Sequence, residues 1–137
     1  MAENVIHLLI LTPYGQYFSG DVDFVEVHSE QYNLGILPNH APLISTLVVS
    51  KMVIKMNNQV FEYAISGGVI SVEKDKTTLI LNSVERSDEI DIERAEQARI
   101  RAQKRLEEAI KNDAIDVNRA KLALLRAVNR INLVSKD

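Results

Sequence analysis

The sequence changes its hydrophobic period once, near residue 87, and this change limits the fold more than any other feature. Before it, apolar residues alternate with polar ones in short runs that end at Gly, Pro or Asn, which is typical of β-strands. After it, alanines and leucines recur every three or four residues, which indicates helices. We therefore predict an N-terminal antiparallel β-sandwich over residues 1–86 and a C-terminal antiparallel two-helix hairpin over residues 87–137.

Several runs in the first part have the pattern of strands. Ile6 to Thr12 predicts a first strand that ends before Pro13. Asp21 to His28 alternates and then changes phase, which predicts either a bulge or a strand with apolar cover on both faces. Two hairpins are expected, one turning at Asn57-Asn58 and one at residues 74–76. Strands this short and closely spaced favour a sandwich or a barrel.

Two irregular segments interrupt the strands. Residues 34–43 contain Pro38 and Pro42, which fix the backbone and predict a rigid, shaped loop. Within it, His40 is either satisfied by loop carbonyls or contacts a partner, and the residues leave both readings open. Ser66-Gly67-Gly68 lies between two strands, so its glycines indicate close backbone approach rather than a phosphate-binding loop, which would need a helix to follow.

Composition excludes several functional classes. Cysteine is absent and the three histidines have no metal-ligand spacing, so we expect no metal site, and no catalytic motif is present. We expect a chain that is not an enzyme. Residues 87–137 hold 11 Lys and Arg against 10 Asp and Glu, and this balance argues against nucleic-acid binding. No apolar run is long enough for direct insertion into a membrane.

The second part begins its helices with a repeated signal. Asp91 is expected to cap the first helix, and the pattern of residues 90–95 recurs at residues 115–120. The apolar seams of the two helices are rich in alanine: Ala95, Ala98, Ala102, Leu106 and Ala109 in the first, and Val117, Ala120, Leu124, Ala127 and Ile131 in the second. An alanine methyl contributes only about 0.8 kcal/mol on burial, so we expect a hairpin that can undock or extend.

Three arginines lie on one face of each predicted helix: Arg94, Arg101 and Arg105 in the first, and Arg119, Arg126 and Arg130 in the second. Arg101, Arg126 and Arg130 have no acidic residue three or four positions away on the helix. These three side chains are either simply solvated or bind a polyphosphate or an acidic protein surface, both of which suit guanidinium groups.

Several long motifs resemble one family over nearly the whole chain. They are residues 34–43 (LGILPNHAPL), 65–69 (ISGGV), 90–95 (IDIERA) and 126–130 (RAVNR), and they resemble the epsilon subunits of bacterial F-type rotary ATP synthases. The resemblance implies a non-catalytic subunit of the rotating central stalk, whose sandwich binds the gamma subunit and the c-ring. It also implies a hairpin that can extend toward the catalytic alpha and beta subunits and inhibit ATP hydrolysis.

The resemblance implies two sets of site residues. Partner contacts would come from Asn33, Pro38, Asn39 and His40, although Asn33 stands where relatives often carry an acidic residue. No cofactor is required, but ATP is a possible regulatory ligand of the folded hairpin, bound by Glu85, Ile90, Asp91, Arg94, Ala95, Arg101, Arg126 and Arg130. The expected location is the cytoplasmic face of the bacterial plasma membrane, as a peripheral subunit. The alternative is a freestanding ligand-binding sandwich with a helical oligomerisation hairpin.

Overall fold

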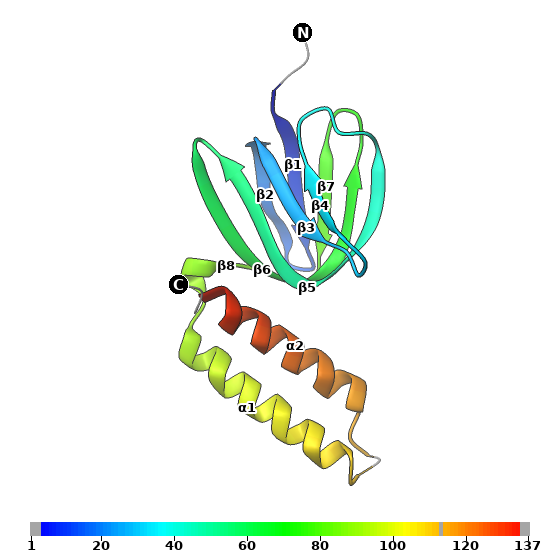
Figure 1. Cartoon of the computed structure of the whole chain (residues 1–137), viewed down its shortest axis with the longest axis vertical. Coiled ribbons are helices and arrows are strands. Elements are labelled where there is room, and N and C mark those ends of the chain that lie inside the picture. Colours follow the sequence, from blue (N-terminus) through cyan, green and yellow to red (C-terminus); the bar gives the residue numbers. More distant parts are fainter. Residues whose placement is uncertain (1–3, 113, 135–137) are drawn as a thin grey trace. The chain divides into compact units, whose positions relative to one another are not determined.

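The computed structural model describes residues 4–112 and 114–134. Contacts divide the chain into two compact units, Met1–Arg86 and Ser87–Asp137. The first unit is built from strands and the second from helices (Figure 1). The strands are β1 (Ile6–Thr12), β2 (Gly15–Val22), β3 (Phe24–His28), β4 (Asn33–Ile36), β5 (Leu43–Met56), β6 (Gln59–Val72), β7 (Thr77–Leu81) and β8 (Val84–Arg86). The helices are the short 3₁₀ helix η1 (Ser87–Glu89), α1 (Ile92–Ala109) and α2 (Val117–Val134).

The strands form a β-sandwich, as the sequence predicts. Their order is β2-β1-β7-β6-β5-β3-β4, and β8 pairs with β6. Strands β5 and β6 have 14 residues each, longer than the short strands expected, because both pass through a bend and contribute to two layers. Residues 68–72 of β6 pair with β7, whereas residues 63–65 pair with β8. All pairs are antiparallel among the described strands except β1 and β7, which run parallel.

The bend in β6 depends on the glycine pair. Gly67 and Gly68 have φ angles of 104° and 153°, which residues with a Cβ rarely adopt. A Cβ on Gly68 would clash with the backbone carbonyl of Ile80 and lie 2.9 Å from the Cα atom of Leu81. The structural reading of these glycines is therefore confirmed: at Gly68 β7 approaches too closely for any side chain, and a Cβ on Gly67 would lie 3.2 Å from the carbonyl oxygen of Leu47 on β5.

The phase change in residues 21–28 has a different cause from either one predicted. The segment is not one strand: β2 ends at Val22 and β3 begins at Phe24, with Asp23 between them. The Asp23 amide donates a 2.8 Å hydrogen bond to the carbonyl of Lys55, which fixes the chain as it leaves one strand for the next. The alternation restarts because β3 pairs with other strands, β4 and β5.

The predicted turns are present. Asn57 and Asn58 have φ angles of 53° and 61°, the values that a two-residue hairpin turn requires. The β6–β7 turn is closed by a 2.8 Å hydrogen bond from the Glu73 amide to the Lys76 carbonyl. The rigid loop is shorter than the predicted segment of residues 34–43, because β4 takes its first residues and pairs them with β3.

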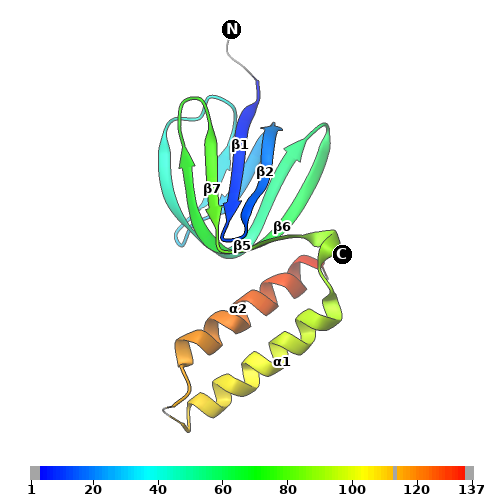
Figure 2. The same ribbon diagram turned by 180° about the vertical axis from the view of Figure 1, so that it is seen from behind.

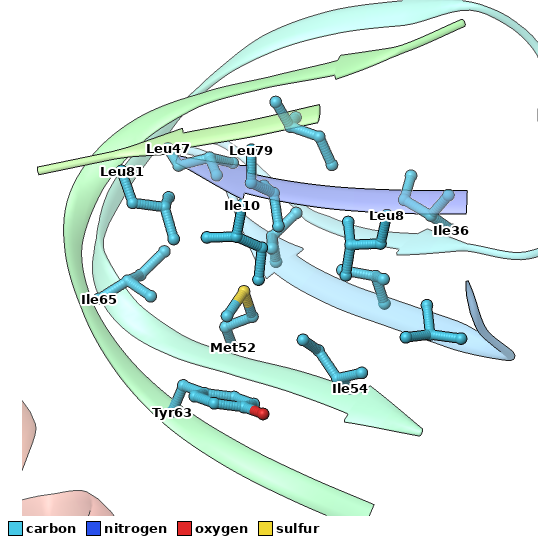
Figure 3. Close-up of a cluster of buried hydrophobic side chains, with 14 of the residues drawn as sticks. Leu8, Ile10, Ile36, Leu47, Met52, Ile54, Tyr63, Ile65, Leu79 and Leu81 are labelled. Carbon is cyan, nitrogen blue, oxygen red and sulfur yellow. The ribbon is translucent and has the colours of Figure 1, made fainter. Parts of the chain in front are cut away.

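A single apolar core fills the space between the two layers (Figure 3). Alternate residues of each strand point inward, which is the expected consequence of the two-residue period of a strand. Leu8 and Ile10 of β1, Met52 and Ile54 of β5, and Leu79 of β7 are among the side chains that are almost completely buried. Each such side chain contributes roughly 1.5–3 kcal/mol on burial, so this unit has the means to fold as a stable body.

Candidate functional site

Helix α1, which carries three of the predicted nucleotide-binding residues (Arg94, Ala95 and Arg101), begins as the sequence predicts. Asp91 has extended backbone angles, and its carboxylate accepts a 3.1 Å hydrogen bond from the amide of Arg94. The carboxylate of Asp116 accepts an equivalent 3.2 Å bond from the amide of Arg119, just before α2. Each bond satisfies an amide that the first helical turn leaves unpaired. The six-residue pattern is therefore a helix-start signal in both copies.

The two helices pack through small side chains. Ala95, Ala102 and Ala109 of α1 are buried at seven-residue intervals, and Ala120 and Ala127 of α2 repeat the same interval. This confirms the alanine seam, although Val117, which was expected to belong to it, is exposed. Figures 1 and 2 show α1 and α2 side by side and antiparallel, joined by residues 110–116.

The arginines occupy one face of this hairpin. A buried alanine of the seam directly follows four of the arginines, namely Arg94, Arg101, Arg119 and Arg126. Successive residues of a helix are rotated by about 100°, so these arginines lie on the same rotational side of the seam in both helices. Because the helices are antiparallel, the same sense in each helix means the same face of the hairpin. Arg105 and Arg130, four residues after Arg101 and Arg126, join them. We call these six residues the arginine face.

The arginine face differs in exposure along its length. Arg94, Arg101, Arg105 and Arg119 are exposed, whereas Arg126 and Arg130 are half-buried. The Nε atom of Arg126 is buried and has no hydrogen-bond partner among the described residues. A buried guanidinium N–H without an acceptor is costly, and an anion would satisfy it. Since α1 starts at the end of the hairpin where α2 finishes, Arg94 shares that end with Arg126 and Arg130.

Three other predicted nucleotide-binding residues have structural roles in this unit. Asp91 is engaged as the helix cap. Ala95 is buried in the seam, and its amide donates to the carbonyl of Asp91 at 3.0 Å. Ile90 is half-buried between η1 and α1, and its amide donates to the Ser87 carbonyl at 3.4 Å. These residues shape the start of α1.

Glu85 is the one predicted nucleotide-binding residue outside the helical unit. It lies in β8 of the sandwich, where it is half-buried and pairs in register with Ala64 of β6.

Three of the four predicted partner-contact residues, Pro38, Asn39 and His40, lie in the loop after β4, whereas Asn33 lies at the other end of that strand. Asn39 has a left-handed backbone, with φ at 66°, and the amide of His40 donates to the carbonyl of Leu37 at 3.2 Å. The Nδ1 atom of His40 lies 2.6 Å from the carbonyl oxygen of Ala41, so the imidazole is satisfied within its own loop. Asn33 begins β4, and its side-chain oxygen pairs with the Nδ1 atom of His28 on β3.

A cavity of about 510 Å³ opens beside this loop. Its wall includes Asn39 and His40 but neither Asn33 nor Pro38, and its other sides come from the start of β1 and from residues 72–77. Buried Ile6, Ile36 and Val72 line its floor. The loop therefore presents a hollow surface at this end of the sandwich.

An apolar surface on the sandwich was not predicted. It consists of outward-facing residues on four neighbouring strands, namely Leu9 and Leu11 of β1, Ile44 and Val48 of β5, Val69 of β6 and Ile80 of β7. Ile44 and Ile80 are 76% and 55% exposed. Leu11, Ile80 and Val69 are direct neighbours in register, so the residues adjoin. We call this set the apolar outer face, and an exposed patch of this kind is typical of a protein-protein contact.

Residues 4–112 and 114–134 contain no group of three His, Asp or Glu side chains able to hold a metal ion. Within the same ranges, neither α1 nor α2 is long and apolar enough to cross a membrane.

Comparisons with known proteins identify both parts of the chain. Residues 5–87 match the model for the ATP synthase delta/epsilon chain, beta-sandwich domain, and residues 88–135 match the model for the long alpha-helix domain of the same family. The chain is 44% identical over 106 residues to the ATP synthase epsilon chain of Pelotomaculum thermopropionicum, covering 77% of this chain and 79% of the relative. It is 40% identical to that of Bacillus subtilis over 103 residues, which cover 75% and 78%.

Solved structures give the same fold. A chain of the Euglena gracilis mitochondrial ATP synthase, in a structure containing OSCP, F1 and the c-ring, superposes with a TM-score of 0.81. It is 17% identical, and the match covers 94% of this chain and 81% of that one. A match to the central stalk and c-ring structure from Tetrahymena thermophila has a TM-score of 0.56 at 14% identity, covering 65% and 72%. With the two family models and the bacterial relatives, this establishes that the chain belongs to the family of bacterial ATP synthase epsilon chains.

Proposed function

We propose that this chain is a non-catalytic rotor subunit of the central stalk, which joins the gamma subunit to the c-ring and regulates ATP hydrolysis through its helical hairpin. The family membership of both parts of the chain carries this proposal. It also implies a location on the cytoplasmic face of the bacterial plasma membrane, as a peripheral subunit held by the complex. Each part of the proposed function has its own proposed surface: the apolar outer face for gamma, the loop after β4 for the c-ring, and the arginine face for regulation.

The apolar outer face is the proposed contact for the gamma subunit. Its apolar side chains would gain stability from leaving water on binding, at about 25 cal/mol per Å² of apolar area. The loop that holds Pro38, Asn39 and His40, with Asn33, is the proposed contact for the c-ring. Its fixed backbone would lose little conformational entropy on binding, which favours a lasting contact in a rotating part.

Substitution of Ile80 by Asp tests the gamma contact. Because Ile80 lies within the apolar outer face, a carboxylate there would have to be desolvated in the interface. We expect the Ile80→Asp chain to lose most of its retention by immobilised gamma subunit in a pull-down. Val60→Asp is the matched control, since Val60 is 60% exposed on β6 but is not part of that face. Equal retention of the two variants would rule out this surface as the gamma contact.

The arginine face is the proposed ATP site. Arg94, Arg126 and Arg130 lie toward one end of the hairpin, and the buried Nε atom of Arg126 lacks an acceptor that a phosphate oxygen would provide. ATP bound there would favour the folded hairpin by mass action. In an extended hairpin the same guanidinium groups would instead meet acidic surfaces of the alpha and beta subunits, so ATP and inhibition would compete.

Calorimetry with ATP tests this site. We expect one binding site per chain, lost in Arg126→Ala and in Arg94→Ala. Arg99→Ala is the control, because the Arg99 guanidinium is held by Glu96 and Gln103 at 3.1 Å each and lies on the other side of the alanine seam. Unchanged affinity in both test variants would place any ATP site elsewhere, and loss of binding in all three would indicate a general effect on the hairpin.

Removal of the helical unit tests the regulatory role. We expect the assembled complex with a chain ending at Ser87 to hydrolyse ATP faster than the complex with the full chain, while assembly is retained. Assembly should be retained because residues 1–86 form a compact unit with its own core. The rate of phosphate release from purified complexes measures the effect. If the two complexes have equal rates, the hairpin does not inhibit hydrolysis in this enzyme.

A further inference from the structure

We draw no further inference here: the strongest candidate, the cavity of about 510 Å³ between the start of β1, the loop after β4 and the β6–β7 turn, has an apolar floor and a rim carrying charges of both signs, and nothing in the structure shows what fills it.

Discussion

Replacement of Gly68 by Ala is expected to destabilise the sandwich more than any other single-methyl change among its glycines. The new Cβ would collide with the carbonyl of Ile80 on β7, and that atom cannot move without breaking the pairing of β6 with β7. Overpacking of a close contact costs about 1–3 kcal/mol, and backbone strain at a positive φ adds a similar amount. We expect a loss of about 3 kcal/mol, which corresponds to a fall of roughly 15 °C in the melting temperature.

Gly15→Ala separates the two causes. Gly15 also has a positive φ, 115°, but a Cβ there would meet no atom within 4 Å. This control therefore carries only the conformational cost, about 1 kcal/mol, and its melting temperature should fall much less. Thermal unfolding followed by far-UV circular dichroism would measure both variants. Equal losses would show that backbone strain, and not the approach of β7, decides why residue 68 is glycine.

The same glycine pair shows how far local sequence could predict the fold. Two adjacent glycines between apolar runs predict a special backbone, and this prediction is confirmed. The residue with which a Cβ on Gly68 would collide, Ile80, is twelve residues away and becomes a neighbour only when β6 and β7 pair. The break at Asp23 was missed for the same reason: alternation reports which face a side chain occupies, but not where the chain moves from one pair of strands to another.

The candidate site was also predicted only in part from the sequence. Helix period alone placed Arg101, Arg126 and Arg130 on faces without acidic neighbours, and the antiparallel packing then puts both rows on one face. The buried Nε atom of Arg126 could not be predicted, because burial depends on packing that the helix period does not contain. The apolar outer face was missed because only the pairing of β5, β6, β7 and β1 brings its scattered residues together.

Replacement of Ala127 by Glu is expected to separate the two helices, because the alanine seam holds them together weakly. Ala127 is 0% exposed, so Glu at this position would bury a carboxylate against α1, where the facing seam residues are alanines. Desolvation of a buried charge costs several kcal/mol, whereas each seam alanine contributes only about 0.8 kcal/mol. Helices of 18 residues are marginal when isolated, so separation of the pair should melt both of them.

We therefore expect Ala127→Glu to lose most of the helical signal at 222 nm, while the amide resonances of the sandwich strands stay in place because that unit has its own core. Ala123→Glu introduces the same charge one turn earlier, at an exposed position of α2, and should keep the helices. Helicity that survived in both variants would mean that the alanine seam does not hold the hairpin together. The proposed switch would then lack its physical basis, since a hairpin that tolerates a buried charge has no weak seam for ATP or a partner subunit to act upon.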